Sequence, residues 1–140
     1  MDTGINLKLK FAYAGLVVAL TCLLSAPAIA QGSKDWVVIK DPKELRAIYA
    51  NKTLRGTGGA GMPFVSHYSA DGRGILIQGD NRTPRTWTVK GKDQVCVTHE
   101  KGTDCFTFER NRKNRNEIIG RHVTQPWSFT ATVEDGIPKF

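Results

Sequence analysis

The stretch DQVCVTHEKGTDCFTF, residues 93–108, decides the fold because its apolar residues alternate on both sides of a turn. Valines and phenylalanines take every second position, which is the pattern of two strands that share one buried face. When Val95 is placed opposite Phe106 in an antiparallel hairpin, Cys96 falls opposite Cys105 on the other face. Opposed residues in such a pair have Cα atoms about 4.5 to 5.5 Å apart, within reach of a disulfide. The spacing therefore predicts a β-hairpin closed by a Cys96–Cys105 bond.

A metal site and a redox-active pair are the alternatives for these two cysteines. Zinc sites bring cysteines about two to four residues apart and add further ligands, whereas redox pairs use the C-x-x-C spacing. Eight residues separate Cys96 from Cys105, and the sequence after residue 30 has no other cysteine. The spacing favours a structural disulfide, and no metal or cofactor is expected.

Short runs with strand-like patterns continue on both sides of the hairpin, between residues 52 and 133. Turn signals such as Asp71-Gly72 separate them, and the connections are short enough for antiparallel neighbours. In the last run, residues 127–133, apolar residues alternate with Ser and Thr, which predicts one buried and one exposed face. About seven or eight strands at regular spacing predict a mainly β domain, built as an antiparallel β-sheet or small barrel. The runs read FVSHYS, GILIQG, RTWTVK, DQVCVT, CFTFER, EIIGRHV and WSFTATV.

One helix is predicted before these strands, in the segment DPKELRAIYANK, residues 41–52. Asp41 is a suitable N-cap, Pro42 fits the first turn, and Glu44 stands three residues after the cap. The helix is expected to end near Asn51. It is expected to pack on the sheet through apolar residues at helical spacing, which are Leu45, Ile48 and Tyr49. The predicted fold class is therefore α+β with a dominant β part.

The first thirty residues have the layout of a bacterial secretory signal peptide. A basic start with two lysines is followed by an apolar run of fourteen residues, 11–24, and by small residues at Ala28 and Ala30. A membrane anchor is one alternative, but the run is shorter than the ~18 residues needed to span a bilayer. Lipid attachment at Cys22 is another, disfavoured by the threonine directly before it. Cleavage after Ala30 is expected, which leaves a single domain at 31–140 in the periplasm or outside the cell.

The chain is basic: its formal charge is +7, and removing two lysines and one aspartate with the signal peptide leaves +6. Five cations lie close together after the hairpin, and guanidinium groups are suited to bind phosphate or sulfate groups. This cluster is a candidate anion-binding site, with a solvated turn as the alternative. The candidate partners are an anionic glycan, a lipid headgroup or another envelope component. No specific nucleic acid is expected, because no aromatic residue alternates with the charges. The cations are Arg110, Arg112, Lys113, Arg115 and Arg121.

No constellation of residues points to catalysis. The motif GTGGAG, residues 56–61, matches the dinucleotide fingerprint, but a strand-like run follows it where a helix is required, so a loop is expected. The three histidines, His67, His99 and His122, have no ligand spacing, and the G-x-S-x-G motif is absent from the sequence. No catalytic residue is assigned, and an enzyme is not expected.

The expected function is non-catalytic: binding of an anionic ligand or support of the cell envelope. One alternative is an inhibitor or adaptor that binds another exported protein through an exposed hairpin or edge strand. Another is a small hydrolase. A deep cavity with converging carboxylates is typical of the hydrolase, whereas a flat basic face is typical of the binder.

The helix and the strands together resemble a family of small exported proteobacterial proteins catalogued as domain of unknown function 995. Members of that family show a helix with a leucine and a tyrosine, a Lys-Thr step, Asp-Gly turns, a tryptophan strand and a cysteine strand. The strand at Trp87 departs from the family pattern because it lacks the preceding glycine. The resemblance implies a secreted, mainly β protein and supplies no activity. The matching features are Leu45, Tyr49, Lys52-Thr53, Asp71-Gly72, RTWTV and DQVCV.

Overall fold

The computed structural model describes residues 35–138, which form nine β-strands, one short α-helix and one 3₁₀ turn. The predicted signal peptide, residues 1–30, lies outside the described residues. Within the described part of the chain, no helix is long and apolar enough to cross a membrane. In chain order the elements are β1 (Trp36–Val38), α1 (Pro42–Ala47), β2 (Lys52–Thr57), η1 (Gly59–Gly61), β3 (Pro63–Tyr68), β4 (Arg73–Gln78), β5 (Asn81–Lys90), β6 (Gln94–His99), β7 (Gly102–Asn111), β8 (Glu117–His122) and β9 (Ser128–Asp135).

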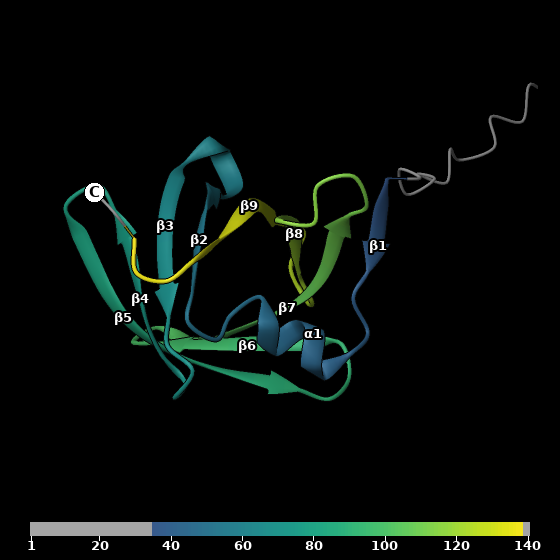
Figure 1. The fold of residues 1–140 in the computed structure, drawn as a ribbon. Helices are drawn as coiled ribbons and strands as arrows, with labels where there is room; N and C mark the ends of the chain where they lie inside the picture. Colours follow the sequence, from purple (N-terminus) through teal and green to yellow (C-terminus); the bar gives the residue numbers. More distant parts are fainter. Residues whose placement is uncertain (1–34, 139–140) are drawn as a thin grey trace, which may run out of the picture. The chain divides into compact units, whose positions relative to one another are not determined.

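Eight of these strands close into an antiparallel barrel (Figure 1). The hydrogen-bonded order is β7-β6-β5-β4-β3-β2-β9-β8, and a further pairing of β8 with β7 joins the two ends. β1 is an extra strand that pairs with the last residues of β7, beyond the segment that β6 covers. The prediction of a mainly β, antiparallel fold is confirmed, and of the two expected architectures, an antiparallel β-sheet or a small barrel, the structure has the barrel. A barrel of this strand number has an interior just wide enough for side chains or for one small ligand.

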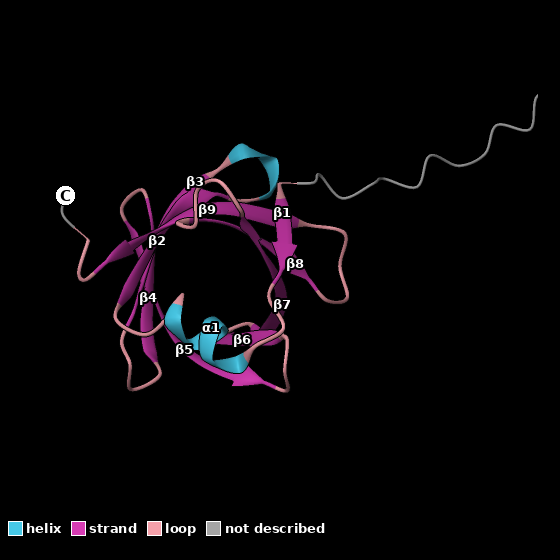
Figure 2. Cartoon of the chain, turned by 45° about the vertical axis from the view of Figure 1, so that its right-hand side comes forward, coloured by secondary structure: helices cyan, strands magenta, loops and turns pink. Residues whose placement is uncertain are grey.

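The two ends of the barrel are built differently. The loops that follow β2, β4, β6 and β8 lie at one end, which we call the open end. The same strands begin at the other end, which we call the helix end because α1 comes directly before the start of β2. Figure 2 shows α1 within the outline of the ring, and it contacts β5 and β6.

The hairpin of β6 and β7 has the predicted register. Val95 pairs with Phe106, and Cys96 pairs with Cys105. Val95 and Phe106 are 0% and 5% exposed, so both face the interior. The two cysteines form the predicted disulfide, with their Cα atoms 4.0 Å apart. Such a bond is compatible with a protein that works outside the cytoplasm, where disulfides persist.

α1 is shorter than the helix predicted from the sequence. The backbone N–H of Lys43 donates to the Asp41 carboxylate at 2.9 Å, which is the predicted N-cap. The helix ends at Ala47, and a turn leads to Asn51, whose φ of 58° directs the chain into β2. The predicted end near Asn51 is therefore wrong by one turn, since the left-handed residue closes a turn after the helix.

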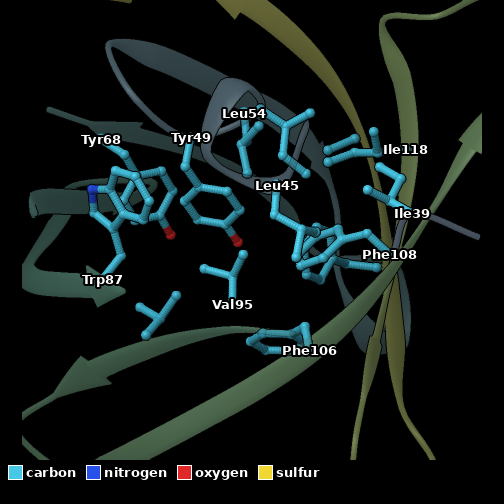
Figure 3. Packing of buried hydrophobic residues seen from close by; sticks show 14 residues of the cluster. Ile39, Leu45, Tyr49, Leu54, Tyr68, Trp87, Val95, Phe106, Phe108 and Ile118 are labelled. Carbon is cyan, nitrogen blue, oxygen red and sulfur yellow. The ribbon is translucent and has the colours of Figure 1, made fainter. Parts of the chain in front are cut away.

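The core is aromatic at its centre, as Figure 3 shows. The ring of Tyr49, just after α1, lies 4.6 Å from that of Tyr68 and 5.3 Å from that of Trp87, measured between ring centroids. Phe108 meets it edge-on at 5.8 Å. Tyr49 and Tyr68 are 1% and 3% exposed, and we call this pair the aromatic floor.

β2 has no counterpart among the predicted strands. Its sequence KTLRGT leads into a glycine-rich stretch, which favours a loop, and the structure places the expected loop only from Gly58 onward. β2 is nevertheless paired on both sides, with β3 and β9. A Cβ on Gly56 would lie 1.9 Å from the carbonyl oxygen of Thr130, so glycine permits the close approach of β9.

Candidate functional site

A cavity of about 190 Å³ lies inside the barrel toward the open end. Met62, in the loop after β2, lines the cavity and is 56% exposed, so the cavity reaches the surface between the open-end loops. The aromatic floor lines its deep part. The other lining residues are Leu54, Gly58, Gly59, Phe64, Ser66, Leu76, Gln78, Arg85, Val97, Phe106, Trp127 and Phe129.

Among the described residues that line the cavity, Arg85 is the only one that carries a full charge. It lies on β5 two residues before the buried Trp87, so both side chains point into the barrel. Arg85 pairs with Gly74 of β4, and Gly74 pairs with Tyr68 of β3. A Cβ on Gly74 would lie 2.4 Å from the Tyr68 ring. The glycine therefore lets that ring lie over β4 toward Arg85.

Arg85 has polar neighbours but no acidic partner. Its guanidinium and the Ser66 hydroxyl both form hydrogen bonds with the Tyr68 hydroxyl. Burial raises the pKa of Tyr68, and these hydrogen bonds with the nearby positive charge oppose the rise only in part, so the phenol stays protonated. Within residues 35–138 no acidic side chain forms an ion pair with Arg85, and its Nε is buried without a hydrogen-bond partner.

Two histidines and one aspartate hold the barrel wall at the open end. Asp104 accepts hydrogen bonds from Nε2 of His99 at 2.9 Å and from Nε2 of His122 at 3.2 Å. Burial alone raises the pKa of Asp104, but the two histidines outweigh it and hold that pKa below its usual value. Nδ1 of His122 accepts from the backbone N–H groups of Thr124 and Gln125, at 3.2 and 3.1 Å. His122 therefore ties the loop after β8 to the wall.

That loop places Trp127 in the cavity lining. The indole ring lies 5.1 Å from the His122 ring and 5.2 Å from the Phe106 ring. The indole N–H donates to the side-chain oxygen of Gln125 at 3.0 Å. Ring contacts and the hydrogen bond of the indole N–H therefore hold Trp127 in place at the opening of the cavity.

The structure brings two of the predicted anion-binding residues together at the helix end. Arg110 of β7 and Arg115 of the following loop both approach the Glu44 carboxylate, each at 3.7 Å. With β1 residues they line a second pocket, of about 140 Å³. The Arg110 Nε is buried without a hydrogen-bond partner, a state that only Arg85 shares among the side chains of the described residues.

The other three cations of the predicted cluster do not join this pocket. Lys113 pairs with Asp35 at 3.0 Å, and the exposed Arg112 lies in the loop after β7. Arg121 pairs with Glu109 at 2.9 Å on the outer face of β7 and β8, whereas Arg110 points inward. The cluster is divided between a pocket, a loop and an outer face, and anion binding by all five residues stays a prediction.

The histidines are less scattered than their sequence positions suggest. His99 and His122 meet at Asp104 because β6 and β8 both border β7. His67 is separate, with its Nδ1 3.2 Å from the Thr53 hydroxyl. Within residues 35–138, no three His, Cys, Asp or Glu side chains are placed to hold a metal ion.

The central site residues, Arg85 and Tyr68, are absent from the sequence-based candidates. A signal for Arg85 was present in the run RTWTVK, where Arg85 has the same parity as Trp87 and Val89. An arginine on the apolar face of a strand marks either an ion pair or a binding site. The distinction needs the closed barrel, which shows that no acidic residue of the described chain reaches Arg85.

Comparison with known proteins gives no relative: no protein-family model, no curated protein and no solved structure matches the chain. The resemblance to the family described as domain of unknown function 995 stays a prediction. The function must be inferred from the geometry of the cavity.

Proposed function

We propose that this protein is a non-catalytic binding protein whose barrel takes up a small organic anion with an apolar body. The observation that carries the proposal is Arg85, a half-buried cation without an acidic partner among the described residues, in an otherwise uncharged cavity. The anion supplies the missing negative charge, and its apolar part fills the space between the aromatic side chains. Tyr68 and Ser66 add polar contacts beside the guanidinium.

The electrostatics of a barrel interior support this proposal. A cation in a low-dielectric interior is costly unless an anion stands beside it. Leaving one of its donors buried and unpaired costs about 1 to 3 kcal/mol, and more for a charged group. A bound carboxylate or similar group beside the guanidinium offsets the cost of the unpaired charge, so binding gains a contribution that the free protein lacks.

The composition of the cavity supports binding rather than hydrolysis. None of its described lining residues is aspartate, glutamate or histidine. Hydrolysis of glycosides by paired carboxylates needs two such groups facing the substrate. The one lining serine, Ser66, is hydrogen-bonded to Tyr68 and not to a base that would activate it.

Binding is proposed to take place in the periplasm or after secretion. The signal-peptide pattern of residues 1–30 and the Cys96–Cys105 disulfide support this location. Within the domain, α1 is proposed to pack on the sheet and close the helix end of the barrel. The burial of Leu45 and Ile48, at 0% and 1% exposure, supports that role.

Thermal unfolding in the presence of organic acids tests the proposal. The purified protein is heated with phenylacetate, with octanoate, and with the neutral amide of each acid. An acid that binds only the folded state stabilises it by about 2.7 kcal/mol at a hundredfold excess over its Kd, which raises the Tm. The amides are expected to give smaller shifts because they bring no negative charge to Arg85.

Two arginine variants serve as the matched pair for this experiment. Arg85→Met is expected to abolish the shift, while Arg82→Met retains it, because Arg82 lies on the same strand but is exposed. Both variants lose one positive charge, so a general effect of basicity acts on both alike. The proposal fails if no acid shifts the Tm of the wild-type protein, or if Arg85→Met responds as the wild type does.

A further inference from the structure

We infer that the ligand of the barrel is an aromatic monocarboxylate with a single ring. The inference rests on the proposed function and adds the chemical class of the ligand. Three observations carry it: the size of the cavity, the aromatic character of its walls, and the single cation inside it.

The size of the cavity limits the ligand to one ring. Its volume is about 190 Å³. An engineered apolar cavity of about 150 Å³ in another protein holds one benzene molecule. The barrel cavity therefore has room for a benzene ring with a short acidic arm. A second fused ring or a long alkyl chain exceeds this volume and has to project through the mouth.

The walls favour an aromatic ring over an aliphatic one. Several rings in the lining already meet edge to face: Phe64 and Phe129 at 5.6 Å, and Phe106 and Trp127 at 5.2 Å, between centroids. Aromatic pairs prefer such tilted contacts at about 4.5 to 7 Å and gain stability beyond the area they bury. A planar ring ligand extends this set of contacts on several sides. The aromatic lining residues are Tyr49, Phe64, Tyr68, Phe106, Trp127 and Phe129.

The single cation sets the charge and shape of the acidic group. Arg85 is the one charged residue in the described lining, so one negative charge balances it. A doubly charged phosphate monoester leaves a second buried charge without a partner, which is costly. A carboxylate is planar and binds a guanidinium through two parallel hydrogen bonds. Arg85 lines the cavity, so its guanidinium is placed to form such a pair.

The positions of these groups orient the ligand. Arg85 stands in register with Tyr68, the last residue of β3, and so lies toward the aromatic floor. Phe64 and Trp127 stand nearer the open end, beside the loops after β2 and β8. The carboxylate therefore enters first and the ring stays near the mouth, in contact with Trp127. Indole fluorescence is thus a direct reporter of the ring.

Calorimetric titration with a small series of acids tests the ligand class. The probes are phenylacetate, cyclohexylacetate, 1-naphthylacetate, decanoate and phenyl phosphate. Phenylacetate is expected to bind tightest, with cyclohexylacetate about two- to tenfold weaker because it lacks the aromatic contacts. Phenyl phosphate is expected to be at least about tenfold weaker, since its second charge has no partner. Naphthylacetate and decanoate are expected to be weaker than phenylacetate because of their size.

Variants locate the ligand within the barrel. Arg85→Met is expected to weaken phenylacetate by at least about tenfold, and Arg85→Lys to recover only part of that loss, because lysine has no planar fork. Arg82→Met is the matched control and keeps wild-type affinity. Phenylacetate is expected to quench the indole signal of the wild type, and the quench is lost in Trp127→Phe although calorimetry still shows binding.

The outcomes separate this inference from the proposed function. Tighter binding of decanoate or naphthylacetate than of phenylacetate, with dependence on Arg85, overturns the single-ring class and leaves the proposed function standing. Equal affinity for phenylacetate and cyclohexylacetate overturns the aromatic requirement in the same way. Binding of none of the acids, or binding that Arg85→Met does not change, overturns both.

Discussion

Two half-buried arginines line the two pockets described above. Arg85 lies above the aromatic floor beside Tyr68, and no acidic residue of the described chain pairs with it. Arg110 lies in the helix-end pocket, 3.7 Å from the Glu44 carboxylate. Both have a buried Nε without a partner, yet of the two only Arg110 has a carboxylate nearby within residues 35–138. The Glu44 carboxylate balances part of the charge of Arg110, whereas for Arg85 the proposed ligand would supply that negative charge.

One short segment of the chain supplies a residue to each region. Glu44 of α1 lines the helix-end pocket, and Tyr49, just after α1, lines the cavity. The two regions are therefore linked through the same short segment of the chain. Single substitutions in this segment are the way to disturb one region while leaving the other intact.

The largest effect is expected from Tyr49→Ala, which removes half of the aromatic floor. Truncating a fully buried aromatic side chain costs about 3 to 5 kcal/mol of unfolding free energy. Urea unfolding measures the loss, and phenylacetate binding is expected to disappear with it. Tyr49→Phe keeps the ring and is the control, with a smaller loss. A loss below about 1 kcal/mol for Tyr49→Ala contradicts the central place given to this ring.

The disulfide lines neither the cavity nor the helix-end pocket, so its removal is expected to change the stability of the protein without changing either region. Cys96→Ser is expected to lower the unfolding free energy by about 2 to 4 kcal/mol, because the unfolded chain loses its cross-link. The folded variant should still bind phenylacetate through Arg85 with unchanged affinity. Labelling of the native protein without reductant should find neither Cys96 nor Cys105 free. Full labelling of both cysteines contradicts the disulfide-closed hairpin described above.

Alkaline pH is expected to weaken the cavity region and not the helix-end pocket. Burial raises the pKa of Tyr49 well above 10.0, and the neighbouring Tyr68 raises it further. Burial also raises the pKa of Tyr68. In the unfolded chain both ionise near pH 10, so the folded state keeps protons that the unfolded state loses. This stability is fully present below about pH 10. As the pH rises further toward the folded-state pKa values, the free energy of unfolding decreases by up to about 1.4 kcal/mol per pH unit for each tyrosine.

Urea unfolding at a series of alkaline pH values measures this decrease. Tyr68→Phe removes one of the two titrating groups and is expected to flatten the slope. An identical slope in Tyr68→Phe indicates that other groups cause the alkaline loss.

The smallest effect is expected from Glu44→Gln, which makes the helix-end pocket resemble the cavity. Without the carboxylate, Arg110 and Arg115 stand together without a counter-ion, at a cost of about 0.5 to 1 kcal/mol. Added sulfate is expected to restore that stability in Glu44→Gln and to have less effect on the wild type. Equal sulfate effects on both proteins show that Glu44 does not neutralise the pocket.

Local patterns in the sequence were sufficient for the hairpin and its disulfide. Strict alternation around Val95 and Phe106 leaves only one register that buries both residues, and the cysteines follow from it. The N-cap at Asp41 is local as well, since it depends on neighbouring residues only. Such features need no knowledge of what the rest of the chain does.

Features that depend on contacts between distant parts of the chain could not be predicted from local sequence patterns. β2 escaped prediction because its sequence contains Gly56, whose role is to admit β9 from far along the chain. The alternation of Arg85 with Trp87 shows a cation on a buried face but not whether an acid comes to meet it. His99 and His122 likewise meet only because β7 lies between their strands. The site depends on closure of the ring, which no short stretch of sequence specifies.

The first strand of the barrel, β2, pairs with its last, β9, with Leu54 opposite Val133. During synthesis β2 through β7 are complete well before β9 is made, so the nascent domain is an open sheet with unpaired edges. Pairing across such a separation is slow, because the entropy of loop closure must be overcome before the contacts form. Until β9 is made, the unpaired edge of β2 can pair in the same register with β9 of a neighbouring copy. Strand-exchanged dimers are therefore the expected product of refolding at high concentration, and dilution favours the closed monomer.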